Sequence, residues 1–63
     1  MCEANAYVQE PDGNYTVFLE SVDVIQPQAD GLLLTTIFGE TKFIKGRILR
    51  LELVDHKIIL QRA

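Results

Sequence analysis

Cysteine, histidine and tryptophan are scarce in this chain of 63 residues, which has one cysteine (Cys2), one histidine (His56) and no tryptophan. A single cysteine excludes an internal disulfide. A domain of this size buries only about 60% of its unfolded surface, and it usually needs further stabilisation. We therefore expect that stabilisation to come from a bound metal, a partner chain or both.

Long apolar segments are missing as well. The longest uninterrupted apolar runs, such as residues 32–34 and 58–60, have three residues each, whereas a membrane-spanning helix needs about 20. The first residues show neither the basic nor the apolar stretch of a signal peptide. A lone free thiol also suits a reducing compartment. The sequence thus predicts a cytoplasmic protein without a membrane partner.

The residue combinations that carry catalysis are not found. His56 follows Asp55, but no serine or second cysteine accompanies them in a pattern that predicts a triad. The acidic residues show no paired spacing typical of acid–base catalysis, and there is no glycine-rich phosphate loop. We therefore predict that the chain is not an enzyme.

Positive charge is limited, because nine acidic residues outweigh six basic ones and give a net charge of −3. The basic residues include a local run of Lys42, Lys45, Arg47 and Arg50. A solvated strand face is the favoured interpretation of this run, and a phosphate-binding stripe is the alternative. Nucleic-acid binders usually carry a clustered basic face, often with aromatic residues, so a nucleic-acid partner is not expected.

Alternating apolar residues and turn signals predict short strands and no helix of normal length. In the first strand Ala4, Ala6 and Val8 share one face. Turns are predicted at residues 11–14, which contain proline and glycine, at Asp30-Gly31 and at Asp55-His56. The predicted strands cover residues 4–9, 15–19 with an extended continuation over 21–25, 32–38, 41–44, 47–54 and 57–61.

This pattern predicts one all-β domain over residues 1–63, arranged as a small SH3-like antiparallel barrel. A bend near Glu20 and Ser21 is plausible, and Gly46 indicates a bulge or a barrel corner. We expect Phe38 and Ile48 in the core. Strands at a sheet edge expose unpaired backbone groups, and pairing across a two-fold axis would cover them, so we also expect a homodimer.

Cys2 is the residue with the most distinctive chemistry. Its thiolate and its own backbone nitrogen can close a five-membered ring on a metal, and the amine of Met1 with that nitrogen can close another. Square-planar nickel(II) or copper(II) suits such donors, whereas zinc prefers a tetrahedron. A second Cys2 across a dimer axis would complete a four-coordinate set. The alternative is that Cys2 is an ordinary small buried side chain.

Four short motifs, in their order and spacing, resemble the CooT family of small proteins tied to nickel insertion into carbon monoxide dehydrogenase. They are residues 1–4 (MCEA), 37–40 (IFGE), 45–48 (KGRI) and 53–58 (LVDHKI). The resemblance implies an SH3-like β fold, a homodimer, and nickel(II) bound at the dimer interface through Cys2 of both chains.

Two functional hypotheses follow. In the first, the protein is a nickel(II)-binding metallochaperone that holds the metal through Cys2 and the terminal nitrogens, Met1 included, and delivers it to a nickel enzyme such as carbon monoxide dehydrogenase. In the second, it is a small RNA- or protein-binding β-barrel whose cysteine is incidental and whose basic run contacts the partner.

Overall fold

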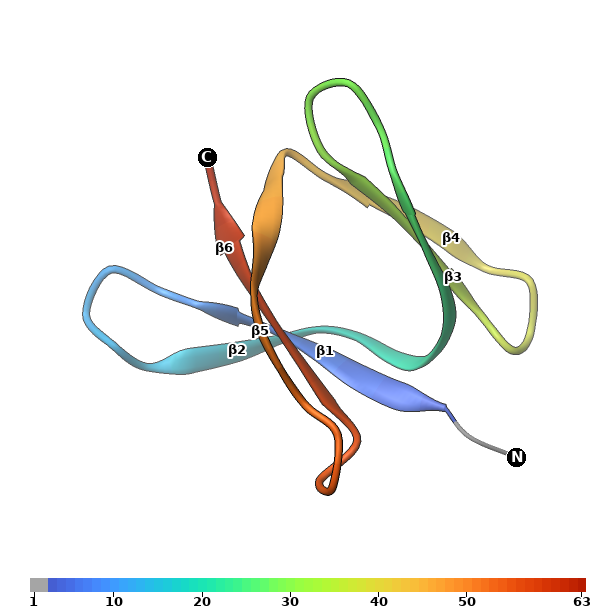
Figure 1. The fold of residues 1–63 in the computed structure, drawn as a ribbon, viewed down its shortest axis with the longest axis horizontal. Helices are drawn as coiled ribbons and strands as arrows, with labels where there is room; N and C mark the ends of the chain where they lie inside the picture. Colours follow the sequence, from blue (N-terminus) through green and yellow to red (C-terminus); the bar gives the residue numbers. More distant parts are fainter. Residues whose placement is uncertain (1–2) are drawn as a thin grey trace.

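The computed structural model describes residues 3–63, and Met1 and Cys2 lie outside the described residues. Six strands and their connecting turns make up the described chain (Figure 1). The strands are β1 (Ala4–Gln9), β2 (Tyr15–Pro27), β3 (Leu32–Thr36), β4 (Thr41–Ile44), β5 (Gly46–Glu52) and β6 (Lys57–Arg62). The prediction of an all-β domain is therefore confirmed.

The strands form one curled sheet in the order β4-β3-β2-β1-β6-β5. Five strand pairings connect the sheet within residues 3–63. Four are antiparallel, and the pairing of β1 with β6 is parallel. The prediction of a strictly antiparallel sheet is therefore wrong for the pairing of β1 with β6. Within the described chain β4 and β5 form no ladder, so the sheet is open there and closure into a barrel stays a prediction.

The core lies inside the curl of the sheet. Ala6 and Val8 of β1 pack there with Leu34 of β3 and Leu60 of β6, and all four are essentially inaccessible to solvent. Ala4 packs against this cluster, which confirms the predicted inner face of β1. Because side chains alternate along a strand, the residues between these positions point to the outer face of the sheet.

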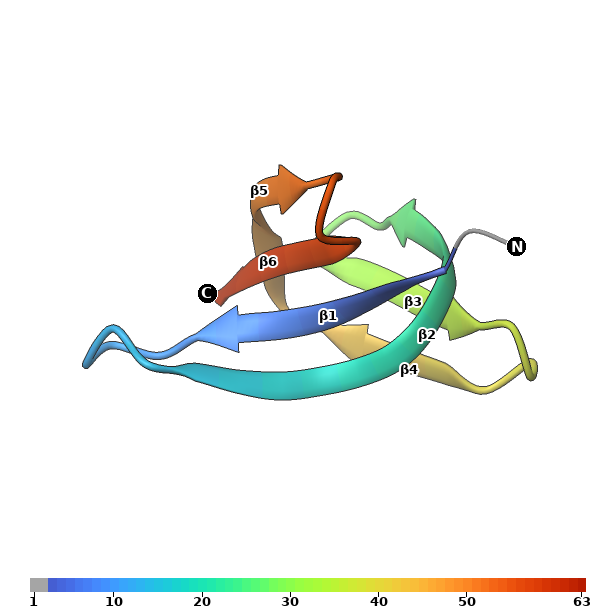
Figure 2. The same cartoon turned by 90° about the horizontal axis from the view of Figure 1, so that it is seen from below.

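β2 is one long strand, as the predicted extended continuation over residues 21–25 requires, and it bends in the middle (Figure 2). Its first part pairs with β1, and its second part, from Val22 on, pairs with β3. The ladder to β1 shifts register beside Ser21, whose φ is 59°. The bend predicted near Glu20 and Ser21 is confirmed, and it lets a single strand serve both halves of the sheet.

β3 ends two residues earlier than predicted, because Thr36 starts a tight turn. Its Oγ1 accepts hydrogen bonds from the backbone N–H groups of Phe38 (3.1 Å) and Glu40 (3.2 Å). Gly39 follows with φ 87°, a conformation that glycine adopts readily. Phe38 lies in this turn and is 83% exposed. The prediction that Phe38 belongs to the core is therefore wrong, whereas Ile48 does pack against the core cluster.

The other predicted turns are present. Asp12 accepts a hydrogen bond from the backbone N–H of Asn14 (3.0 Å), as aspartate often does in turns. The chain changes direction sharply between β4 and β5, where Gly46 lies against the backbone of Gln61 with no room for a side chain (Figure 1). This supports the corner interpretation of Gly46. β5 ends at Glu52, earlier than the predicted residue 54, and a turn follows.

Candidate functional site

The predicted metal ligands, Met1 and Cys2, lie outside the described residues, which begin directly after them at Glu3. β1 begins at Ala4, two residues after Cys2 in the sequence. Within residues 3–63, no three His, Asp or Glu side chains are grouped closely enough to hold a metal ion. The metal site at Met1 and Cys2 stays a prediction.

Asn5 fixes the start of β1. Its backbone N–H donates a hydrogen bond to the carbonyl oxygen of His56 (3.0 Å), and its side-chain Oδ1 accepts one from the backbone N–H of Ser21 (3.1 Å). Asn5 therefore connects three segments that are far apart in the sequence: the start of β1, the bend of β2 and the turn before β6. Sequence reasoning gave Asn5 no role beyond a place on the face opposite Ala4.

A surface groove of about 310 Å³ lies beside the start of β1. Its polar lining residues are Glu3, Asp23, His56 and Lys57. Val22, Ile58 and Leu53 are among its apolar ones. The groove thus combines two acidic residues, a histidine and a lysine with apolar residues.

His56 reaches this groove through the parallel pairing of β1 with β6, in which Asn5 lies opposite Lys57. The prediction that His56 occupies a turn is confirmed. Its backbone has φ 54°, in the left-handed region, and its N–H donates to the carbonyl of Leu53 (3.2 Å). His56 is solvent-exposed. Although 52 residues lie between Glu3 and His56 in the sequence, the two line the same groove.

The basic run seen in the sequence does not form one surface. The Lys42 ammonium hydrogen-bonds the carbonyl of Phe18 (3.1 Å) and lies 4.4 Å from the centre of its ring. Arg50 lies on β5, at the opposite end of the sheet order from the β4 strand of Lys42, and its guanidinium contacts Tyr15. The stripe proposed from the sequence is therefore divided between two separate contacts.

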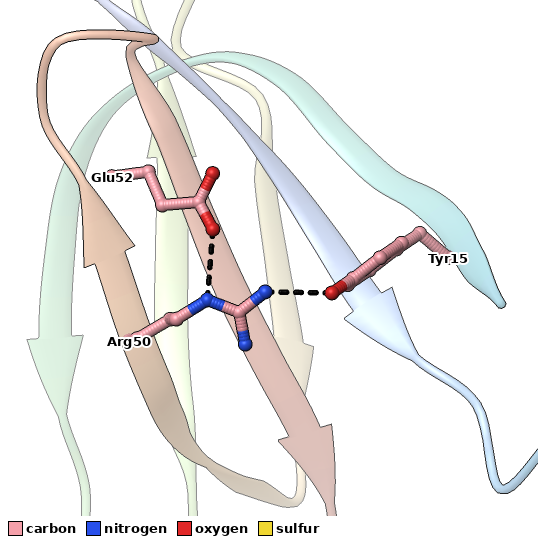
Figure 3. Close-up of polar contacts among 3 residues, drawn as sticks. All are labelled: Tyr15, Arg50 and Glu52. Carbon is pink, nitrogen blue, oxygen red and sulfur yellow. Dashed lines mark hydrogen bonds and ion pairs between the residues drawn. The ribbon is translucent and has the colours of Figure 1, made fainter. Parts of the chain in front are cut away.

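Arg50 is held from two sides, as Figure 3 shows. Its Nε donates to a carboxylate oxygen of Glu52 (2.8 Å), and its Nη2 donates to the hydroxyl oxygen of Tyr15 (2.6 Å). The hydrogen bond to Glu52 and then that to Tyr15 raise the pKa of Arg50 above its ordinary value. Lys57 lies 5.7 Å from the ring centre of Tyr7 nearby. Tertiary structure thus creates the aromatic–basic grouping that the sequence pattern lacked.

Comparison with known proteins decides the family. The family model described as CO dehydrogenase accessory protein CooT matches residues 1–61, which include Cys2. The chain belongs to the CooT family. This CooT chain is also similar to a crystal structure described as "putative CooT from Carboxydothermus hydrogenoformans". The match has a TM-score of 0.91 and 52% sequence identity, and it covers 98% of each chain. No curated protein matches the sequence.

The family match confirms the resemblance carried by the four sequence motifs. CooT is named as an accessory protein of CO dehydrogenase, which describes assistance to an enzyme and not catalysis. No helix in residues 3–63 is long and apolar enough to cross a membrane.

Proposed function

We propose that this CooT protein binds nickel(II) through the Cys2 thiolate and the terminal backbone nitrogens, including the amine of Met1, and delivers it to CO dehydrogenase. The observation that carries the proposal is the family match over residues 1–61, with its description as a CO dehydrogenase accessory protein. Nickel is the cargo in this scheme. Planar thiolate and nitrogen donors suit nickel(II) better than zinc.

The protein's own contribution is a fixed base for the metal-binding terminus. Hydrogen bonds from Asn5 to His56 and from Ser21 to Asn5 hold the start of β1. Ligand exchange between the Cys2 thiolate and a client enzyme can then transfer the metal.

A homodimer fits the surface around the groove. Leu53 and Leu51 line it and are 73% and 50% exposed. Burying such side chains stabilises association by about 25 cal/mol per Å² of apolar surface. Because a two-fold interface uses the same patch on both copies, a dimer over this groove would bring the two β1 strands to one axis, and both Cys2 residues could then share one metal.

Titration of the purified protein with nickel(II), followed by absorption spectroscopy, tests the metal site. We expect a thiolate-to-nickel charge-transfer band that saturates at one metal for every two chains and is lost in Cys2→Ser. His56→Gln is the matched control for an imidazole ligand, and we expect the band to persist in it. A band that survives in Cys2→Ser would refute the proposed ligand.

Sedimentation or light scattering tests the interface. Leu53→Glu should convert the dimer to a monomer, since it places a charge in the proposed apolar contact at the groove. Phe38→Glu is the control, because Phe38 is also a largely exposed apolar side chain but does not line the groove. A dimer that tolerates Leu53→Glu and dissociates with Phe38→Glu would show that the interface lies elsewhere.

A further inference from the structure

The outer face of the sheet carries a partly apolar row that the nickel site does not use. Consecutive strands place Val17, Tyr7, Ile59 and Arg50 beside one another, since Tyr7 pairs with Val17 and with Ile59, and Ile59 pairs with Arg50. Ile59 is only 3% exposed, although it faces away from the core between Ile58 and Leu60. The side chains around it must therefore cover it on the outer face.

These covering side chains form a shallow hollow of about 150 Å³. Tyr7, Tyr15, Arg50, Glu52 and Lys57 surround Ile59 at its floor. Sites for drug-sized ligands usually exceed about 300 Å³. The hollow thus has the size of a single side chain and not of a nucleotide or cofactor.

The polar groups of the hollow favour an anion. Arg50 donates one N–H to Glu52 and one to Tyr15, and its remaining guanidinium N–H groups are available to a ligand. Among residues 3–63 the Lys57 ammonium takes part in no ion pair. Two cations against one carboxylate leave a local excess of positive charge, in a protein whose net charge is −3.

The Arg50 guanidinium is also held in position before a partner binds. Glu52 and Tyr15 hold the guanidinium in place before any partner arrives, so little side-chain entropy is lost on binding (Figure 3). Tyrosine and arginine beside a buried apolar residue are the types that dominate binding energy at protein interfaces.

We propose that this outer-face hollow docks an acidic side chain of a partner protein, with Arg50 and Lys57 contacting the carboxylate and the two tyrosines framing it. A single-stranded nucleic acid fits less well, because it needs a positive groove that follows several phosphates. The hollow offers only two cations. This inference does not depend on the nickel site, since it uses no residue of the proposed metal ligands.

Nuclear magnetic resonance of the ¹⁵N-labelled full chain tests the proposal, with a hexaglutamate peptide as the probe. We expect the amides of Tyr7, Tyr15 and Ile59 to shift on titration. Arg50→Gln should weaken binding about tenfold, the equivalent of one charge-assisted hydrogen bond. Lys57→Gln should weaken it as well.

Lys45→Gln is the matched control, because it removes the same charge from an exposed residue outside the hollow. It should change the affinity by less than about twofold, as expected of a distant screened charge. Tyr15→Phe keeps every charge and removes only the hydroxyl that holds Arg50, so a smaller loss of about threefold is expected. This variant keeps the test decisive should Arg50→Gln fail to fold.

Three results would overturn the proposal: equal weakening by Lys45→Gln, shifts that spread over the whole surface, or no shift at millimolar peptide. Tighter binding of oligouridine with the same dependence on Arg50 would also overturn it, in favour of a nucleic-acid site. Nickel titration of Arg50→Gln should match wild type, which separates failure of this site from failure of the metal site.

Discussion

Replacing Asn5 by alanine should destabilise this domain more than its partly exposed position suggests. The side-chain Oδ1 accepts the backbone N–H of Ser21 at 3.1 Å, in a part-buried contact across 16 residues of sequence. Alanine leaves that N–H without a partner at the bend of β2, where loss of a hydrogen-bond partner costs about 1–3 kcal/mol. Ser21 is also held at φ 59°, which a residue other than glycine adopts at a cost of about 1–2 kcal/mol.

The expected loss is a large fraction of the domain's free energy of unfolding. At about 0.05–0.15 kcal/mol per residue, a chain of this length has a free energy of unfolding of roughly 3–9 kcal/mol. At the middle of both ranges, the change should therefore remove about a third of the free energy of unfolding. Urea unfolding followed by far-ultraviolet circular dichroism measures it, because the midpoint falls while the slope with denaturant stays unchanged.

Asn5→Asp is the matched control, since its carboxylate keeps an acceptor at the same place. We expect its free energy of unfolding to stay within about 1 kcal/mol of wild type. Amide exchange of Ser21 should accelerate in the alanine variant and stay slow in the aspartate variant. Equal stability of wild type and Asn5→Ala, or equal losses in both variants, would refute the assigned role of the side chain.

Three further changes test other parts of the fold. Leu34→Ala removes a side chain that is 0% exposed, so it should lower the free energy of unfolding by about 2–5 kcal/mol and leave little folded protein by circular dichroism at 37 °C. Gly46→Ala places a methyl group against the carbonyl of Gln61, and urea unfolding should show a loss of about 1–3 kcal/mol, whereas an unchanged midpoint would mean that β5 can shift freely. His56→Gly relieves a left-handed backbone at φ 54° and should raise the free energy of unfolding by about 0.5–1 kcal/mol, which appears as a slightly higher thermal midpoint. A lower thermal midpoint would show that the imidazole itself contributes contacts.

Local sequence signals predicted most of the strands. β1 and β4 agree with the sequence prediction at both ends, and β6 differs by one residue. Alternation of apolar residues is a local property, because neighbouring side chains on a strand point to opposite faces. The turn at residues 11–14 was equally predictable, since Asp12 and Gly13 carry turn chemistry wherever they occur.

The errors of the sequence prediction arose where tertiary contacts, which a local sequence pattern does not reveal, decide the structure. Phe38 continues an apolar run and was predicted to be buried, but the Thr36 hydroxyl binds two amides that follow it and turns the chain outward. The prediction that residues 21–25 continue the strand of residues 15–19 is confirmed, and the structure adds what supports the bend at Ser21, namely Asn5 and the ladder to β3.

The sequence by itself determined that the chain is all-β, that its turns fall at the glycine and aspartate signals, and that its one thiol is Cys2 beside Met1. Only the tertiary structure decided which strands pair. The parallel ladder of β1 with β6 joins the two ends of the described chain, and it brings His56 to the start of β1 and Ile59 beside Tyr7. The period of two fixes which face a side chain occupies, but it does not fix its neighbour. Strand order follows from burying all the apolar faces at once, and that is a property of the whole sheet.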